Sequence, residues 1–321
     1  MTRRVTVKEL GEFELIARIE RWARSAFPAR HRHVALGIGD DAAVLRPPGG
    51  HDLVVTTDAA VEGVHFRFDH ESAATAGRRA MVANLSDLAA MGARPLAFTL
   101  ALTLPAETPV ERVRGLVRGV LREAAAAGCP LVGGNVARGG EISMSITAHG
   151  SVPRGSALRR SAGRARDHLM VTGALGRSAL ERYRGRVRSV PVPRLAAGQA
   201  LARMSGAQAC IDLSDGLVAD AGHLARASGV RAVIDVARVP RPRGFERACR
   251  AAGASAEDLL LGGGEDFELL FSVRPGAGGA AALSRRLGVE VTEIGWLEPG
   301  AGVGVLGASQ NRDVEAGWRH F

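Results

Sequence analysis

The pattern of apolar and polar residues along the chain predicts two successive groups of mixed strands and helices. Apolar residues recur at helical spacing in some segments and form continuous or alternating runs in others, which indicates helices and strands respectively. In the first half the predicted elements are an amphipathic helix within residues 1–23, strands near 34–39 and 52–58, a helix near 72–91, a strand near 95–105, a helix near 108–128 and a strand near 141–152.

A glycine- and arginine-rich segment separates this group from the second. The stretch "PRGSALRRSAGRAR" begins at residue 153, and its composition is typical of a domain boundary. We therefore expect an N-terminal domain over residues 1–152 and a C-terminal domain over residues 153–321. The second group runs from "HLMVTG" to "VTEIGWLE" and again mixes strands with helices. This order favours a two-domain protein of the α/β and α+β classes.

The composition is that of a globular protein without a membrane segment. Hydrophobic residues make up 46% of the 321 residues, and no apolar run approaches the ~18–20 residues that cross a bilayer. The N-terminus lacks the apolar core of a signal peptide. Cys129, Cys210 and Cys249 are far apart and lack zinc spacing, so we expect buried free thiols. These features predict a cytoplasmic protein with no membrane partner.

The excess of basic residues does not indicate a nucleic-acid partner. The formal net charge is +9 and the isoelectric point is about 10.9, but the basic residues are scattered and all except Lys8 are arginines. Aromatic residues, which stack on bases, make up only 4% of the chain. A phosphorylated ligand is a more suitable counterpart for this charge.

Five segments place carboxylates beside apolar runs. They are "GIGDD" (37–41), "LVVTTDAAVEGVHF" (53–66), "NLSDLAAMG" (84–92), "CIDLSDGL" (210–217) and "LLLGGGEDFELLF" (259–271). Any one of these acids can be explained as a helix cap or a turn residue, and Ser214 and Asp215 suit the start of the helix that follows them. For the whole set this explanation is weaker, because ionised carboxylates beside buried apolar residues need partners.

Divalent cations are the partners that the sequence favours. No Lys or Arg lies within residues 36–45 or 53–66. Hard oxygen ligands without soft ones are the set that Mg²⁺ prefers, and Mg²⁺ commonly completes its shell with water and phosphate oxygens. Asp40 can orient its loop or bind a cation through water. The candidate Mg²⁺ ligands are Asp41, Thr56, Thr57, Asp58, Asp87, Asp212 and Asp215.

Two glycine-rich segments are compatible with a phosphate ligand. In "LVGGN" and "LGGGED" backbone N–H groups can approach an anion closely, although a tight turn is the commoner reason for paired glycines. The chain contains no Walker-type phosphate loop and no protein-kinase signature. Phosphoryl transfer here would depend on metal ions and positioning.

With these residues in view, the chain resembles the thiamine-monophosphate kinase family. Nine segments are similar to blocks of that family in their order and spacing, from about Gly11 to Phe321, with the weakest match between about 163 and 192. They are "GEFELIARI", "GIGDDAAVL", "TTDAAVEGVHF", "NLSDLAAMGARP", "TLALTLP", "DLSDGLVADAGHLA", "GGGEDFELLF", "EIGW" and "GWRHF".

The resemblance implies a fold, a reaction and an assembly. It implies an N-terminal domain like that of aminoimidazole ribonucleotide synthetase, whose strands form a barrel at the interface of a homodimer, and a C-terminal α+β domain that closes the active site. The implied reaction is ATP + thiamine phosphate → ADP + thiamine diphosphate, by direct in-line transfer with several Mg²⁺ ions. The implied ligands are the substrates, ATP and thiamine monophosphate, and the metal ions.

Matched positions give each candidate residue an implied role. Asp41, Asp58, Asp87 and Asp212 resemble the catalytic Mg²⁺ ligands, accompanied by Thr56, Thr57 and Asp215. The nucleotide contacts are implied to be Gly134, Asn135, Arg160 and Ser214. The thiamine-phosphate contacts are implied to be His65, Glu265 and Trp318. His65 fits a half-buried structural histidine equally well, and Trp318 fits a residue that anchors the C-terminus.

The chain departs from the family at two loops. It has "GGNV" at 133–136 where the family often reads "GGDT", and "SAGRARDHL" where the family more usually has "SGAKPGD". The substitution at Asn135 removes a charge and puts direct metal ligation there in question. It also leaves open a non-catalytic binding protein. A related synthetase acting on a purine intermediate or on selenide is a further alternative, but no cysteine precedes Cys129, and this argues against a selenophosphate synthetase.

Overall fold

The computed structural model describes residues 5–28, 31–39 and 42–308. The chain divides into two compact units, which are described separately. The N-terminal unit comprises Met1–Leu88, Arg94–Arg154 and Arg186–Val190, and the C-terminal unit comprises the remaining segments, Ala89–Ala93, Gly155–Gly185 and Pro191–Phe321. The main division at Arg154 lies close to the boundary expected at residue 152. Two short segments are exceptions to a single cut, since Ala89–Ala93 belongs to the C-terminal unit and Arg186–Val190 belongs to the N-terminal unit.

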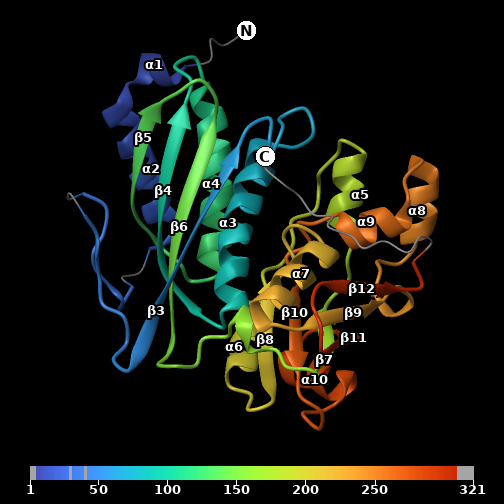
Figure 1. Cartoon of the computed structure of the whole chain (residues 1–321). Helices are drawn as coiled ribbons and strands as arrows, with labels where there is room; N and C mark the ends of the chain where they lie inside the picture. Colours follow the sequence, from blue (N-terminus) through green and yellow to red (C-terminus); the bar gives the residue numbers. More distant parts are fainter. Residues whose placement is uncertain (1–4, 29–30, 40–41, 309–321) are drawn as a thin grey trace. The chain divides into compact units, whose positions relative to one another are not determined.

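A four-stranded sheet forms the centre of the N-terminal unit (Figure 1), with the strand order β3-β6-β4-β5. A separate two-stranded sheet precedes it. The main elements of the N-terminal unit are α1 (Val7–Leu10), α2 (Glu12–Ala26), β1 (Val34–Leu36), β2 (Val44–Leu45), β3 (His51–Val61), α3 (Ala73–Ala90), β4 (Arg94–Leu104), α4 (Val110–Ala126), β5 (Leu131–Arg138) and β6 (Ser143–Pro153).

The two faces of this sheet differ in burial. Along β6 Met144, Ile146 and Ala148 are fully buried, whereas the alternate residues Thr147 and His149 are only half-buried. Successive side chains of a strand point to opposite faces, so one face forms the core beneath the helices. We call the other, less buried side the open face. It includes Thr57, Ala59, Thr99, Ala101, Thr103, Ser143, Ser145, Thr147 and His149.

Glycines allow the helices on the buried face to pack closely. A Cβ atom at Gly77 of α3 would lie 2.0 Å from the carbonyl oxygen of Leu116 in α4. A Cβ at Gly119 of α4 would lie 2.2 Å from the carbonyl oxygen of Ala74. No side chain fits at either position, so these glycines fix the contact between α3 and α4.

A six-stranded mixed sheet forms the centre of the C-terminal unit, with the order β12-β9-β11-β7-β10-β8. Only the pair of β12 and β9 is parallel. The elements are η1 (Arg160–Ala162), β7 (His168–Thr172), α5 (Arg177–Tyr183), α6 (Leu195–Ala202), β8 (Ala207–Asp212), α7 (Leu217–Ser228), β9 (Arg231–Asp235), η2 (Val236–Arg238), α8 (Phe245–Ala252), α9 (Ala256–Gly262), β10 (Leu269–Val273), α10 (Ala280–Leu287), β11 (Val291–Glu298) and β12 (Val303–Leu306).

Both faces of this second sheet are covered. On β10, Leu270 packs in a core with α7, α8 and α9, while its neighbour Phe271 packs in a second core with α6 and α10. The sheet therefore has continuous apolar strands, because each side chain enters a core whichever face it points to.

The predicted two-domain arrangement of mixed strands and helices is confirmed at this coarse level. The strong helices near 72–91 and 108–128 are present as α3 and α4, and all three cysteines are buried and free. In the part of the chain that the structure describes, the sheets are open and none closes into a barrel. Within residues 5–28, 31–39 and 42–308, no helix is both long and apolar enough to cross a bilayer.

Candidate functional site

In the N-terminal unit, strand β3 and helix α3 bring three candidate metal ligands to one face. Thr56 and Asp58 are two residues apart on β3 and therefore share a face. The Thr56 hydroxyl donates a hydrogen bond to the Oδ2 carboxylate oxygen of Asp87, which lies on α3. These oxygen atoms are the donor type that suits Mg²⁺.

Thr57 points the other way. Its hydroxyl lies on the open face, 3.1 Å from the Thr147 hydroxyl and 3.2 Å from the carbonyl oxygen of Ile146, to which it donates. The Thr57 side chain is thus directed away from Asp87, and the Thr56 hydroxyl is the one that reaches this carboxylate.

The candidate nucleotide residues of β5 lie at the far edge of the same sheet. Asp58 pairs with Ile146, Ile146 with Leu100, and Leu100 with Gly134, so these residues form one row across four strands. Three strand spacings separate the ends of the row, about 14 Å along the sheet. Asn135 belongs to the next row, so its side chain lies on the open face, opposite to that of Asp58.

Gly134 has a packing role that its sequence context does not reveal. A Cβ atom there would lie 2.0 Å from the carbonyl oxygen of Leu100 on the neighbouring strand β4. The close approach of two backbones, as well as any approach of an anion, therefore requires glycine at this position.

His65 follows β3 and is held by backbone contacts. Its Nδ1 accepts a hydrogen bond from the Val61 N–H at 3.1 Å, and its own N–H donates to the Val61 carbonyl at 2.9 Å. In the neutral ring the proton is then on Nε2, which leaves that nitrogen as a donor. A half-buried side chain with these backbone contacts is what the structural interpretation of His65 predicts.

In the C-terminal unit, four candidate residues lie on two adjoining loops. Asp212 ends β8 and is buried, and Ser214 and Asp215 follow before α7 begins. We call residues 212–216 the Asp212 turn. The N-cap residue of α7 is Gly216, and no side-chain hydrogen bond caps the helix there. Neither Ser214 nor Asp215 is therefore the N-cap.

Asp220, in the first turn of α7, organises the Asp212 turn. Its Oδ2 oxygen accepts three backbone hydrogen bonds, from Ser214 at 3.0 Å and from Asp215 and Gly216 at 3.1 Å each. Asp220 is not among the candidates predicted from the sequence. Its available signal was an acid in the first helical turn, directly after the "DLSDG" block.

The electrostatics of this region favour a cation. Burial and the neighbouring carboxylates of Asp212 and Asp215 together raise the pKa of Asp220 to about 8, against the opposing effect of the backbone N–H donors. Oxygen and nitrogen atoms of Asp215, Asp220 and His223 all lie within 4.8 Å of one another. A hard divalent cation would relieve the repulsion among these carboxylates, and their oxygen atoms suit Mg²⁺, whereas His223 supplies a nitrogen atom of the type that Mg²⁺ seldom binds.

The second loop, residues 263–267, carries Glu265 and is called the Glu265 loop. The Glu265 N–H donates to the Ser214 carbonyl at 2.8 Å, and the Phe267 N–H donates to the Leu213 carbonyl at 2.9 Å. A Cβ atom at Gly264 would lie 2.5 Å from the same Ser214 oxygen. The loop with the candidate substrate residue is therefore fixed directly beside the Asp212 turn.

Asp266 connects the Glu265 loop to helix α5. Its two carboxylate oxygens accept hydrogen bonds from the backbone N–H groups of Gly176 at 2.6 Å and Ser178 at 3.3 Å. Asp266 thus caps a helix about ninety residues earlier in the chain, a pairing that local sequence patterns do not reveal.

Arg160 lies apart from Ser214 within the C-terminal unit. Its carbonyl oxygen accepts a hydrogen bond from the Ser228 hydroxyl at the C-terminal end of α7, whereas Ser214 precedes the N-terminal end. Twelve residues of α-helix span about 18 Å. The backbone of Arg160 therefore lies near the opposite end of this helix from Ser214, next to Arg159, which pairs with Ala209 of β8.

The candidate residues that the structure describes are divided between the two units. Asp40, Asp41 and Trp318 lie outside the described residues. Thr56, Asp58 and Asp87 belong to the N-terminal unit, and Asp212, Asp215 and Glu265 belong to the C-terminal unit.

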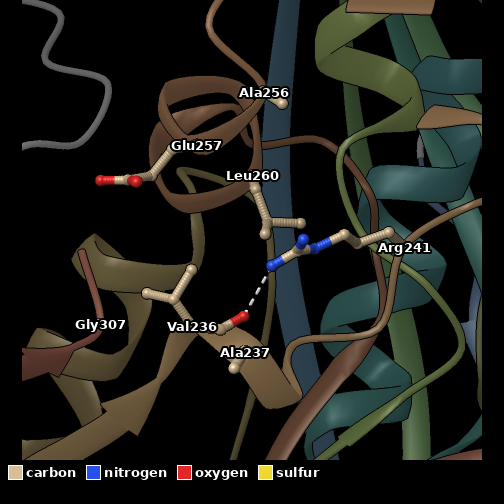
Figure 2. Close-up of a pocket in the computed structure, with 7 residues that line it drawn as sticks. All are labelled: Val236, Ala237, Arg241, Ala256, Glu257, Leu260 and Gly307. Carbon is tan, nitrogen blue, oxygen red and sulfur yellow. Dashed lines mark hydrogen bonds between the residues drawn. The ribbon is translucent and has the colours of Figure 1, made fainter. Parts of the chain in front are cut away.

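A cavity of about 370 Å³ occurs elsewhere in the C-terminal unit (Figure 2). Its charged lining residues are Arg241 and Glu257, and Arg241 donates a hydrogen bond to the Val236 carbonyl at 2.7 Å. Arg241 also pairs with Glu246. Among the candidate metal, nucleotide and substrate residues that the structure describes, none lines this cavity.

Comparison with known proteins first defines the class. Residues 39–152 match the family model of the AIR synthase related protein, N-terminal domain, and residues 167–307 match that of the AIR synthase related protein, C-terminal domain. The two matches cover most of the chain, and each falls largely within one of the compact units.

Closer relatives define the family. The thiamine-monophosphate kinase of Salmonella typhimurium is 39% identical over 304 residues, covering 89% of this chain and 90% of the relative. A crystal structure of the thiamine-monophosphate kinase from Stenotrophomonas maltophilia K279a is 36% identical, with a TM-score of 0.79 over 94% of this chain and 98% of that one. The structure described as AaThiL complexed with AMPPCP and TMP is 31% identical, with a TM-score of 0.74 and complete coverage of both chains. The chain belongs to the thiamine-monophosphate kinase family, as the resemblance of its blocks predicted.

The cap that Asp266 provides should make the stability of the C-terminal unit depend on pH. Burial, outweighing the two N–H donors and Arg182, raises the pKa of Asp266 from 3.8 to about 6. Such a group stabilises the fold below about pH 4 and loses this contribution as pH rises through about 6. We expect Asp266→Asn to flatten this part of the pH profile and to lower the free energy of unfolding by about 1 kcal/mol, because one acceptor is lost. Chemical denaturation across this range in the presence of a chelator measures both effects.

Asp258→Asn is the matched control, since Asp258 is exposed near the start of α9. An unchanged pH slope in Asp266→Asn would contradict the assignment.

Proposed function

We propose that the chain transfers the terminal phosphoryl group of ATP to thiamine monophosphate, which yields ADP and thiamine diphosphate. The proposal depends on one observation above all. The Asp212 turn, which carries candidate metal ligands, and the Glu265 loop, which carries the candidate substrate residue, are hydrogen-bonded side by side in a chain of the thiamine-monophosphate kinase family. This arrangement suits a reaction in which a metal-bound nucleotide meets a phosphorylated acceptor.

The chemistry that we infer is a direct in-line transfer. An oxygen of the thiamine monophosphate phosphate group attacks the terminal phosphorus of ATP, and the bond from that phosphorus to the bridging oxygen of ADP breaks. No residue of the chain needs to carry the phosphoryl group. The contribution of the chain is then to position the two phosphates and to balance their charge.

Mg²⁺ would supply the positive charge that neutralises the phosphates in this site. We propose that Asp58 and Asp87 of the N-terminal unit and Asp212 and Asp215 of the C-terminal unit hold it, together with Asp41. Thr56 would contribute through its hydroxyl, whereas Thr57, whose hydroxyl lies on the open face, would contribute through its backbone carbonyl. The hydrogen bond from Thr56 to Asp87 and those from the Asp212 turn to Asp220 support the proposal, because they hold carboxylates in fixed positions.

Separate residues would bind the two substrates. We propose Gly134, Asn135, Arg160 and Ser214 as nucleotide contacts, and His65, Glu265 and Trp318 as thiamine monophosphate contacts. The protonated Nε2 of His65 and the carboxylate of Glu265 suit hydrogen bonds to a polar ligand. We expect no nucleic acid or membrane as a partner, and the buried free thiols support a reducing, cytoplasmic location.

A homodimer is part of the proposal. The open face of the N-terminal sheet carries small residues and hydroxyls, including Ala59, Ala101 and Thr147. Leu53 and Val55 of edge strand β3 expose 52% and 55% of their surface on this face. A sheet face of small and apolar residues suits packing against the same face of a second copy.

The first test is turnover with the proposed substrates. ADP release in the presence of ATP and Mg²⁺ should require thiamine monophosphate, and thiamine diphosphate should form in equal amount. A coupled assay for ADP together with chromatography of the thiamine esters measures both. Equal turnover with an aminoimidazole precursor, or no turnover with thiamine monophosphate, would contradict the proposal.

The candidate carboxylates should be required for turnover. We expect Asp87→Asn and Asp212→Asn each to lower kcat/KM at least about 100-fold, the usual order for the loss of a charge-stabilising group, and to weaken the response to Mg²⁺. Asp52→Asn on β3 and Asp235→Asn at the end of β9 are the controls, because neither residue is a candidate ligand. Near-normal activity in both Asp87→Asn and Asp212→Asn would show that these acids are structural.

The dimer should depend on the open face. Thr147→Arg places a long charged side chain in the middle of this face and should convert the dimer to a monomer, as measured by sedimentation or light scattering. Ala125→Arg, on the exposed surface of α4, should leave the mass unchanged. A monomeric wild-type protein, or a dimer that persists in Thr147→Arg, would argue against this interface.

A further inference from the structure

We propose that Arg182 is a positioning residue that holds the carboxylate of Glu265 in place for thiamine monophosphate. This inference rests on the proposed function, in which Glu265 contacts the substrate. Arg182 lies on α5, within the part of the chain where the resemblance to the family blocks is weakest.

The backbone of the Glu265 loop adopts an unfavourable conformation that needs outside support. Glu265 has a φ of 57° and Phe267 a φ of 51°, both in the left-handed region that non-glycine residues seldom adopt. Such residues persist where surrounding contacts fix them, and they are common at ligand sites. The hydrogen bonds to Ser214 and Leu213 hold one side of this loop.

Helix α5 holds the other side of the loop and is tied to it at both ends. At its start, Asp266 accepts hydrogen bonds from Gly176 and Ser178. Between the ends the contact is tight, because a Cβ atom at Gly263 would lie 2.3 Å from the Cβ of Ala179. The third tie is Arg182 in the last turn of the helix.

Arg182 contacts the loop through two groups at once. Its Nη1 donates to Oε2 of Glu265, and its Nη2 donates to the carbonyl oxygen of Gly263 and, at 3.5 Å, to that of Gly264. A guanidinium has a planar array of donors, so it can fix the carboxylate relative to the backbone of the loop. Both side chains are partly exposed, with 34% and 25% of their surface accessible, so the pair lies where a ligand can reach it.

This geometry would act on binding. Glutamate loses several rotamers when it binds a ligand, and a side chain that is already fixed avoids that cost. Thiamine monophosphate carries a positively charged thiazolium ring and an amino group, for which a carboxylate is a suitable partner. Arg182 would set the direction in which Glu265 presents that carboxylate.

The test compares the Michaelis constants of the two substrates. In Arg182→Met we expect the KM for thiamine monophosphate to rise about three- to tenfold, as follows from the loss of one preorganised side chain, while the KM for ATP stays within about twofold. Arg182→Lys should be intermediate, because a single ammonium group cannot reach the carboxylate and the carbonyl together. Arg184→Met is the matched control, since Arg184 follows α5 and donates to the Ala248 carbonyl instead.

A double-mutant cycle separates action through Glu265 from direct action on the substrate. If Arg182 works through Glu265, Arg182→Met should not raise the KM for thiamine monophosphate further when it is added to Glu265→Gln. A full additional rise would mean that Arg182 contacts the substrate itself, and the inference would be wrong. Thermal unfolding of each variant shows whether the fold is retained; if Arg182→Met does not fold, Arg182→Lys provides the same comparison.

The two levels of the hypothesis can fail separately. Wild-type turnover with thiamine monophosphate is measured first, and its absence would contradict the proposed function. Turnover in the wild type with an unchanged KM in Arg182→Met, or equal rises in the KM of both substrates, would contradict only the role of Arg182.

Discussion

The backbone pairing between the Asp212 turn and the Glu265 loop is the contact on which the C-terminal site depends. The Glu265 N–H donates to the Ser214 carbonyl, and the Leu213 N–H donates to the carbonyl of Glu268. Such close contact requires glycine on both sides, because a Cβ at Gly216 would lie 2.8 Å from the Gly262 backbone and one at Gly264 would lie 2.5 Å from Ser214. Residues about fifty positions apart thus share one rigid frame.

This frame also explains how several acids can lie together. The Asp220 carboxylate accepts hydrogen bonds from three backbone N–H groups of the turn. Asp212 and Asp215 lie close enough to raise the pKa of Asp220. Like charges held this close disfavour ionisation unless a cation joins them. In the N-terminal unit a carboxylate is also held by a hydrogen bond, because the Thr56 hydroxyl donates to Asp87. Each unit therefore presents oriented oxygen donors.

The sequence predicted the elements better than it predicted the contacts between them. Helices such as α3 and α4 follow from apolar periodicity, which is a local property. The capping of α5 by Asp266, the support from Asp220 and the pairing of Arg182 with Glu265 depend on tertiary contacts, which no local pattern contains. Gly134 is an example of a role that depends on a tertiary contact and that the local sequence does not reveal. Its position was noted for anion binding, yet a neighbouring strand alone would already require glycine there.

The register of the N-terminal sheet links the proposed nucleotide contact at Asn135 to the proposed dimer. Asn135 pairs with Ala101, and its side chain lies on the open face, whereas Asp58 and Thr56 lie on the helix-covered face. A ligand held by Asp58 would have to pass the edge of the sheet to reach Asn135 in the same copy, about three strand spacings away. A second copy packed on the open face would change the surroundings of Asn135 but not those of Asp58. The role proposed for Asn135 would therefore depend on the proposed assembly in a way that those proposed for Thr56, Asp58 and Asp87 would not.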